Sequence, residues 1–426
     1  MAVGLARRRF AVFALFFLPG LATASWVSRT PDVRDALGAS TGRMGLILFG
    51  LSVGSMSGIL GSGALVARWG TRPVIAAGTA ATAAGCGVVG LGAGAGSGVL
   101  VAAGLALIGL GMGGGEVALN VEGAEVERLL GRSTLPAMHG CYSLGTVIGA
   151  VAGMALTAAR FPVAWHLSVV GALVLVVLVP VLRYVPSGVG RRPAAQAIAT
   201  PADTPSPTSS TPTSTPTPAP GRAAVWREPR LLLIGGVIFA LALAEGTAND
   251  WLPLVMVDGH GFDPALGSAV YAVFAASMTV GRFVGGRFVD RFGRAVALCA
   301  SALVGAAGIA VVSLVDDQAV AAAAAVLWGL GAALGFPVAI SAAGDSGENP
   351  AARISLAATV GYVAFLVGPP SIGRLGAHLG LRNALLAVLA LVAAASLATP
   401  AAGPVRSRQV GRGQPEPETE RCRSRP

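Results

Sequence analysis

The chain has 426 residues, of which 54% are hydrophobic and 12% charged, and its mean hydropathy is +0.71. Soluble domains carry about 25% charged residues, so the composition argues against a soluble enzyme and for helices that are apolar all round, as a bilayer accepts them. The net charge of +10 is arginine, placed in the gaps between apolar runs, which fits the positive-inside rule and not a nucleic-acid partner.

The chain opens with three arginines and an apolar run, which is also typical of a signal peptide. Eleven further apolar runs follow, so the first is expected to stay attached as a transmembrane helix. A spanning helix needs about 20 mostly apolar residues. Twelve runs reach this length, at about 10–28, 44–66, 74–94, 98–121, 138–158, 164–184, 231–251, 267–287, 295–314, 320–342, 354–373 and 383–401. The runs are continuous and not alternating, and they are too long for barrel strands, which argues against a β-barrel, so we expect an all-α membrane protein.

The basic residues predict the orientation of these twelve helices. An even number of spans places both termini on one side of the membrane. Of the 30 basic residues, 23 fall in segments on that side, six fall on the other side, and Arg282 lies inside a helix. The positive-inside rule then predicts that both termini are cytoplasmic. We expect a multi-pass protein of the inner (plasma) membrane.

One segment between the sixth and seventh runs breaks the apolar pattern. It contains TPADTPSPTSSTPTSTPTPAPG, which offers little to bury and is expected to be a disordered cytoplasmic linker. The predicted organisation is a six-helix bundle at 1–185, the linker at 186–229, a second six-helix bundle at 230–402 and a polar cytoplasmic tail at 403–426.

The two halves resemble each other in sequence. Trp26 ends the first predicted helix, and Trp251 ends the seventh. The stretches LIGLGMGGGEVALN and LWGLGAALGFPVAIS align, so that Gly109, Gly111 and Gly115 match Gly329, Gly331 and Gly335. A tandem repeat of this kind is typical of transporters.

Two short charged loops occupy equivalent places in the halves. They read GALVARWGTR at 63–72 and GRFVDRFGR at 286–294. Both resemble the G-x-L-x-D-R-x-G-R loop of the major facilitator superfamily. The second loop keeps Gly286, Asp290, Arg291, Gly293 and Arg294, with Phe288 in place of Leu; the first keeps Gly63, Leu65, Arg68, Gly70 and Arg72, but has Ala67 in place of the acid.

The loops, the repeat, the helix count and the central linker agree with that superfamily over nearly the whole chain. The resemblance implies two pseudo-symmetric bundles, a solute path between them and gating by the two loops. Asp290 is expected to accept from arginines and from a neighbouring helix N-terminus in the outward-open state. Two further stretches, ASWVSRTPDVRDALGAS at 24–40 and GGGEVALNVEGAEVERLLGR at 113–132, resemble a bacterial branch near the fucose-type sugar permeases.

Ionisable groups in the apolar runs are the first candidates for function, because charge in lipid is costly. Glu116 and Asn120 are spaced i, i+4 and share one face of the fourth helix. Burial disfavours the charged form of a carboxyl, so Glu116 could carry a coupling proton. The alternative is that it pairs with an arginine as structure.

The seventh helix offers a second polar group. Glu245 is expected near its middle, Asn249 one turn further on the same face, and Asp250 beside Trp251 near the outer interface. Each could line the solute path, or serve the structure of the interface.

Four other residues complete the candidate set. Arg29 follows Trp26 and could hold an anionic or hydroxylated solute, although pairing with Asp32 or Asp250 is favoured. His139 and Tyr142 open the fifth helix, where His139 could serve a proton path. Arg282 is interpreted as a snorkelling or gate residue.

The sequence therefore predicts a secondary active transporter for a small polar solute, working by alternating access and coupled to protons. It is expected to act as a monomer in the lipid bilayer, without a cofactor. No nucleophile–base pair indicates an enzyme, and the four cysteines have no metal-ligand spacing.

The alternatives to a transporter of this kind are a non-transporting sensor or assembly protein on the same fold, and a multidrug exporter. The sensor should lack acids in its helices, and the exporter should be rich in aromatics, which make up only 6%.

Overall fold

A computed structural model describes residues 2–131, 134–191, 228–347 and 350–403. This part of the chain is helical and contains twelve helical segments long and apolar enough to cross a membrane. The predicted fold class is confirmed. The N-terminal helices are α1 (Ala2–Val27), α2 (Thr30–Leu37), α3 (Thr41–Trp69), α4 (Thr71–Gly94), α5 (Gly98–Leu130), α6 (Leu135–Ala158) and α7 (Val163–Leu182). The C-terminal helices are α9 (Pro229–Leu254), α10 (Pro264–Phe292), α11 (Arg294–Leu314), α12 (Gln318–Gly344), α13 (Pro350–Leu379) and α14 (Leu381–Ala398), with a π-turn η2 (Val255–Gly259) and a 3₁₀ turn η3 (Thr399–Ala402).

The predicted linker and tail fall largely in 192–227 and 404–426, outside the described residues. Several helices run further than their apolar runs predicted, α5 and α10 among them. α5 continues past residue 121 to Leu130, and α10 starts at Pro264 and ends at Phe292. In both helices the extra turns carry charged side chains, which hydropathy alone does not count as part of a span. The short helix α2 was not predicted, because its sequence TPDVRDAL is polar.

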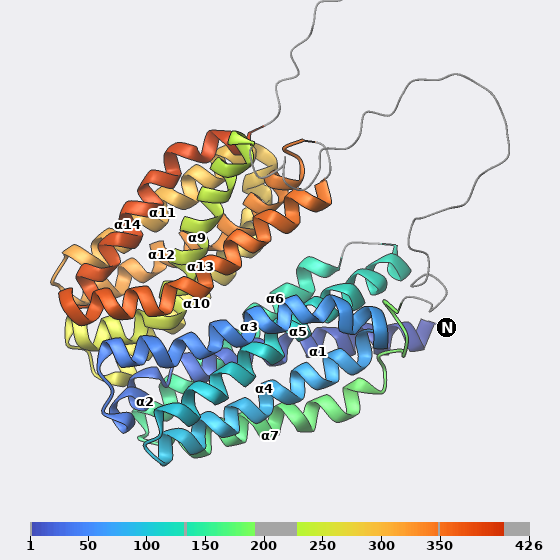
Figure 1. The fold of residues 1–426 in the computed structure, drawn as a ribbon, viewed down its shortest axis with the longest axis horizontal. Helices are drawn as coiled ribbons and strands as arrows, with labels where there is room; N and C mark the ends of the chain where they lie inside the picture. The colour runs from blue at the N-terminus through green and yellow to red at the C-terminus, as the bar shows by residue number, and fades with distance from the viewer. Residues whose placement is uncertain (1, 132–133, 192–227, 348–349, 404–426) are drawn as a thin grey trace, which may run out of the picture.

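The helices form two bundles, α1–α7 and α9–α14, that lie at an angle to each other (Figure 1). Both bundles use the same helix starts. Ser40 and Asp263 cap α3 and α10, and Ser97 and Asp317 cap α5 and α12, in each case with the side-chain oxygen accepting from a backbone N–H of the first turn. Equivalent caps at equivalent helices agree with the sequence repeat.

The matched glycines pack in equivalent ways in the two bundles. A Cβ on Gly109 of α5 would lie 2.0 Å from the carbonyl oxygen of Leu51 in α3, and a Cβ on Gly329 of α12 would lie 2.4 Å from that of Phe274 in α10. Only glycine permits backbones this close. The repeat therefore packs α5 against α3 in the same way as it packs α12 against α10.

The end of the molecule where α1 begins and α14 ends is called the termini end, and the opposite end the distal end. The bundles meet at the distal end and diverge toward the termini end (Figure 1). One apolar cluster joins them there and includes Trp26, Met44 and Trp251. Gly45 of α3 lies against Gly373 of α13, where a Cβ would come within 2.9 Å of the opposite Cα. The distal seam is thus closed by backbone-to-backbone packing.

Three polar contacts between the bundles reinforce this seam. Arg34 of α2 donates to the carboxylate of Asp258 in η2, and the Ser268 hydroxyl of α10 donates to the carbonyl of Ser28. Nearer the middle, the Ser52 hydroxyl donates to the Phe365 carbonyl at 2.9 Å. Along the α6–α10 contact the Phe283 ring lies over Gly140, further toward the termini end.

Candidate functional site

The polar groups of the helices gather where the two bundles face each other. Glu116 lies near the middle of α5, yet its side chain is exposed. It has no hydrogen bond or ion pair to any residue of the described part of the chain, but it interacts electrostatically with Arg282 and Glu245 of the other bundle. An exposed carboxylate at this depth that interacts with the opposite bundle faces the space between the bundles.

Glu245 of α9 and Arg282 of α10 form an ion pair with an N–O distance of 2.9 Å. The Glu245 side chain is 12% exposed and the Arg282 side chain 31%. The pair lies within the C-terminal bundle, and its arginine also attracts Glu116. One cation is therefore shared by two carboxylates on opposite bundles. The sequence marked Arg282 as an intramembrane charge but did not reveal its partner, which lies 37 positions away on another helix.

Asn120, His139 and Tyr142 lie on the N-terminal side of this site. The Asn120 side-chain oxygen is 2.9 Å from Nε2 of His139, and the His139 ring meets Phe16 edge-on. Tyr142, on the next turn of α6, interacts electrostatically with Glu116, Glu245 and Arg282. The structure thus brings together the candidates that the sequence placed on the fourth and fifth spans.

The other polar residues of α9 lie closer to the distal seam. Asn249 accepts a hydrogen bond from the Tyr271 hydroxyl at 3.3 Å. Asp250 has no hydrogen-bond or ion-pair partner among the described residues, but it interacts electrostatically with Tyr271.

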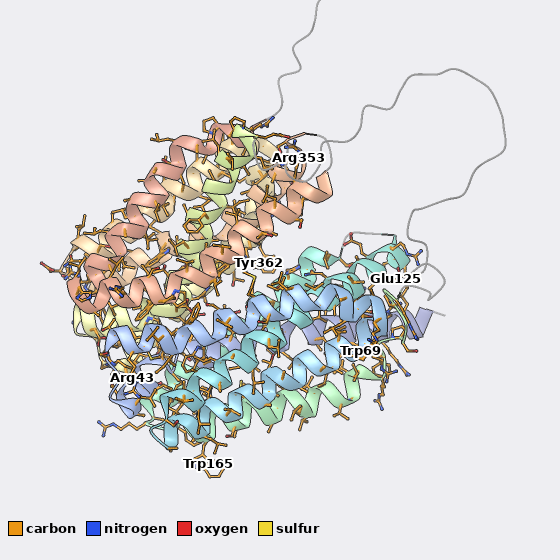
Figure 2. The ribbon with its side chains drawn as sticks, viewed as in Figure 1. Arg43, Trp69, Glu125, Trp165, Arg353 and Tyr362 are labelled. Atoms are coloured by element: carbon orange, nitrogen blue, oxygen red, sulfur yellow. The ribbon has the colours of Figure 1, made fainter. Side chains whose placement is uncertain are left out.

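Neither Tyr271 nor Tyr362 was singled out from the sequence, because a tyrosine in an apolar run is more often a packing residue. Tyr362 interacts electrostatically with Glu116 and lies on the side of the C-terminal bundle turned toward the N-terminal bundle (Figure 2).

Arg29 and Trp26 do not belong to this cluster. Trp26 is buried in the distal seam. Arg29 pairs with Asp32 at 2.8 Å and also donates to the Phe161 carbonyl, which is the structural alternative considered from the sequence. Burial raises the pKa of the Asp32 carboxyl above its usual value, although Arg29 and the Thr157 hydroxyl both favour its charged form.

The two motif loops form matching tight turns at the termini end. Gly70 and Gly293 have φ values of +86° and +81°, a conformation that favours glycine. Arg68 lies over the Trp69 ring and Arg291 over the Phe292 ring, with centroid distances of 5.8 and 5.5 Å. Each turn therefore has a stacked arginine beside its glycine.

The charged and small residues of these loops differ between the bundles. Arg294 pairs with Asp345 at 2.5 Å. Asp290 is exposed, and neither it nor Arg72 has a polar partner within the ranges that the structure describes. A Cβ on Gly63 or Gly286 would meet nothing within 4 Å, so neither motif glycine lies in a close helix contact in this structure.

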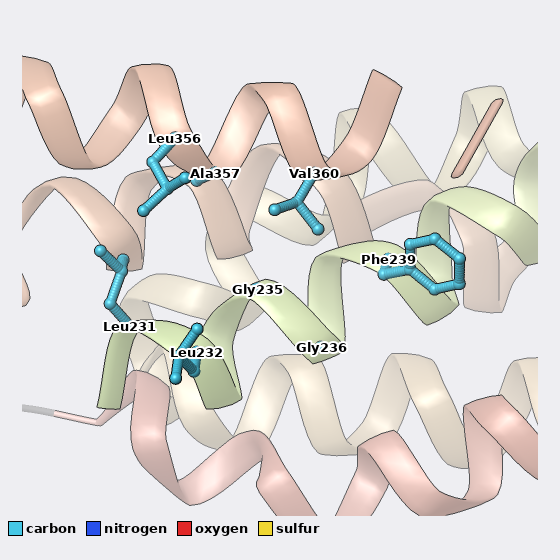
Figure 3. A pocket seen from close by; sticks show the side chains of 8 residues that line it. All are labelled: Leu231, Leu232, Gly235, Gly236, Phe239, Leu356, Ala357 and Val360. Atoms are coloured by element: carbon cyan, nitrogen blue, oxygen red, sulfur yellow. The ribbon is translucent and has the colours of Figure 1, made fainter. Parts of the chain in front are cut away.

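An apolar pocket of 230 Å³ lies between α9 and α13, near the starts of both helices (Figure 3). Its lining includes Leu232, Gly235, Gly236 and Phe239 from α9 and Leu356 and Val360 from α13. In the described residues no group of three His, Cys, Asp or Glu side chains is placed to hold a metal ion. The site is thus an arrangement of two carboxylates, one guanidinium, amides and tyrosines.

Comparison with known proteins gives a consistent match. The sequence profile of the Major Facilitator Superfamily matches residues 10–369. An uncharacterized MFS-type transporter of Yersinia pestis is 28% identical over 384 residues, covering 89% of this chain and 92% of that protein. The uncharacterized transporter y4wD of Sinorhizobium fredii is 29% identical over 391 residues, covering 89% and 97%.

Solved structures show the same fold at low identity. A point mutant of the nucleoside transporter NupG has a TM-score of 0.70 at 14% identity, covering 93% of this chain and 99% of that one. A bacterial homolog of the human lysosomal transporter Spinster, in an inward-facing and unoccupied conformation, has a TM-score of 0.65 at 14% identity, covering 94% and 97%. A point mutant of the Escherichia coli fucose:proton symporter FucP has a TM-score of 0.58 at 16% identity, covering 92% and 98%.

Proposed function

Because the chain belongs to the Major Facilitator Superfamily, a family of membrane transporters and not of enzymes, we propose that it is a secondary active transporter. It moves a small polar solute by alternating access, coupled to protons. The observation that carries this proposal is Glu116, an exposed carboxylate in the middle of α5 that faces Arg282 and Glu245 across the space between the bundles.

Alternating access requires two bundles that can meet at either end. The bundles of this structure are closed at the distal end and diverge toward the termini end. With both termini in the cytoplasm, as the arginine distribution predicts, this arrangement is open to the cytoplasm. The solute would bind between the bundles, where Asn120 and Glu245 line its path, and rocking of the bundles would expose it to the other side.

The shared arginine supplies a physical route to proton coupling. A negative Glu116 is attracted to Arg282 of the opposite bundle, whereas a protonated Glu116 is not, so its protonation state changes the interaction between the bundles. Solute binding between the bundles biases the same equilibrium, the one between the inward-open and the outward-open arrangement of the bundles. Two ligands that bias one equilibrium are thermodynamically linked.

Reconstituted liposomes test the proposal. Purified protein is screened against sugars and small metabolites with and without a pH gradient, and the Glu116→Gln variant is compared with wild type. Glutamine mimics the protonated acid, so we expect counterflow exchange to persist while pH-driven accumulation is lost. Asp35→Gln provides a control, because Asp35 pairs with Arg34 at the exposed distal end, far from the site.

Wild-type accumulation by Glu116→Gln under a pH gradient would contradict the assignment of the coupling proton, and Glu245 would become the next candidate. A protein that moves no solute in either assay would favour the non-transporting sensor on the same fold.

A further inference from the structure

His139 of α6 lies between the central carboxylate and the termini end. α6 begins at Leu135 at the termini end, so His139 is near its start and Tyr142 lies almost one turn deeper. On α5, which runs the other way, Glu116 is near the middle and Asn120 is one turn nearer the termini end. Asn120 contacts His139, and Tyr142 interacts electrostatically with Glu116. The four residues therefore form two levels, with Glu116 and Tyr142 at the deeper level and Asn120 and His139 at the outer one.

The outer level is within reach of the carboxylate. Glu116 and Asn120 are four positions apart on one face of α5, which is about 6 Å along the helix axis. The Nε2 atom of His139 is 2.9 Å from the Asn120 side-chain oxygen. His139 is therefore about one helical turn from Glu116, a gap that one or two water molecules bridge.

His139 also faces the space between the bundles. It is exposed, although it contacts the Asn120 amide and meets the Phe16 ring edge-on within its own bundle. It interacts electrostatically with Arg282 of the opposite bundle. Because the bundles diverge toward the termini end (Figure 1), His139 lies beside the way that leads from Glu116 to that opening.

The hydrogen bond to Asn120 determines which ring nitrogen of His139 takes up a proton. The Asn120 side-chain oxygen only accepts, so Nε2 of a neutral His139 carries the hydrogen. Nδ1 is then the basic atom, and it has no hydrogen-bond partner among the described residues. A neutral imidazole held in this way has one free basic nitrogen.

Arg282 is the charge that acts on His139 from a neighbouring helix. α6 packs on α1, α10 and α5. α1 presents the neutral Phe16 ring, and its Arg8 is engaged by the buried Glu122; α5 presents the amide and the carboxylate described above. Hydronium is scarce near neutral pH and is repelled by the Arg282 guanidinium, whereas an imidazole, with an ordinary pKa of about 6.5, holds a proton there.

We propose that His139 is the proton relay between Glu116 and the solution at the termini end. On release, the Glu116 carboxyl gives its proton to water between the two side chains, Nδ1 of His139 takes one up from that water, and the imidazolium gives it to the solution. Each step moves one proton, and uptake is the reverse. The proposal rests on the transport function proposed above and names the route of its coupling proton, with Asn120 as the residue that positions the imidazole.

Proton transfer to Glu116 is measured without a solute. Purified full-length protein in detergent, in weakly buffered solution, receives a proton pulse from photolysis of 2-nitrobenzaldehyde. Time-resolved infrared spectroscopy follows the carboxyl band of protonated Glu116, which is identified by its absence in Glu116→Gln. His139→Gln keeps a hydrogen-bond donor for Asn120 but cannot carry a proton, so we expect protonation of Glu116 to slow by about tenfold or more.

Added imidazole separates a relay from a structural role. His139→Ala should be as slow as His139→Gln, and imidazole should restore its rate, because the small side chain leaves room for the free base. The glutamine of His139→Gln fills that room, so this variant should respond much less. His378→Gln is the control, because His378 is exposed at the distal end of α13, and its rate is expected to equal that of wild type.

Equal rates of Glu116 protonation in wild type and His139→Gln would overturn the proposal, as would the lack of any carboxyl band that depends on Glu116. A slow His139→Ala that imidazole does not accelerate would also overturn it, because the loss would then be structural. The liposome assay separates this outcome from failure of the transport function. A relay found by infrared in a protein that moves no solute would contradict only transport, and wild-type pH-driven accumulation by His139→Gln would contradict only the relay.

Discussion

Two acids of α5, six residues apart, have opposite environments. Glu116 is exposed toward the other bundle, whereas the Glu122 side chain is 0% exposed. Glu122 accepts from Nε of Arg8 at 2.7 Å and from the Thr71 hydroxyl at 2.7 Å. These three groups tie α5 to the starts of α1 and α4 within one bundle. We therefore assign Glu122 to structure and Glu116 to function.

Replacing Glu122 by glutamine should destabilise the protein. The substitution leaves the buried Arg8 guanidinium without its counter-charge, and breaking a buried ion pair in this way costs about 3–5 kcal/mol of the free energy of unfolding. Thermal or denaturant unfolding in detergent measures the loss. Glu125→Gln is the control: its partner Arg128 is largely exposed, so water screens the pair and a much smaller loss is expected. Equal losses of stability in the two variants would contradict the assignment of Glu122 to structure.

Side-chain partners were the part of the site that the sequence could not predict. Glu116 and Asn120 were found because an acid and an amide at i, i+4 in an apolar run are unusual. The pairing of Arg282 with Glu245 depends on how α9 and α10 are rotated against each other, which a hydropathy pattern does not record. The same holds for Glu122, whose burial depends on Arg8 at the start of another helix.

At the scale of elements, the short helix α2 joins the bundles at the distal end. Proline near its start and Gly38 in a left-handed conformation after its last residue set its length. Arg34 of α2 pairs with Asp258 of the other bundle and with Asp35 of its own helix. The ion pair to Asp258 therefore opposes separation of the bundles, and the pair to Asp35 does not.

Asp258→Asn should loosen the distal seam, and Asp35→Asn should not. A cysteine in place of Ser268, which is buried at this seam, reports opening through its rate of maleimide labelling. Exposed ion pairs contribute about 0.2–1 kcal/mol, so Asp258→Asn should speed labelling by about two- to fivefold. The same acceleration in Asp35→Asn would show that loss of charge on α2, and not the contact between the bundles, controls the seam.

The main elements could be predicted because lipid imposes a simple requirement. A segment that crosses the bilayer must be a long apolar helix, and twelve such runs correspond to the twelve spans observed in the described residues. The sequence match of Gly109 with Gly329 agrees with the equivalent packing of these glycines in the two bundles. α2 and η2 were missed because they do not cross the bilayer by themselves and have no apolar run of spanning length.

At the scale of the whole molecule, the seam and the site lie at different depths. The apolar and backbone contacts between the bundles are concentrated at the distal end, and Glu116, Arg282 and Glu245 lie near the middle of the molecule. Rocking about the middle would exchange contacts at one end for contacts at the other while the carboxylates remain beside the solute. Alternating access in this protein depends on this exchange.

Distances between the ends of α3 and α10 test the exchange directly. Spin labels replace Trp69 and Phe292, exposed side chains at the termini ends of these helices, and a second pair replaces Arg43 and Leu266, exposed near their distal starts. We predict that acidification with a transported solute shortens the first distance and lengthens the second, with both populations present in the absence of solute. Distances that change together, or one fixed population at both ends under all conditions, would contradict alternating access in this protein.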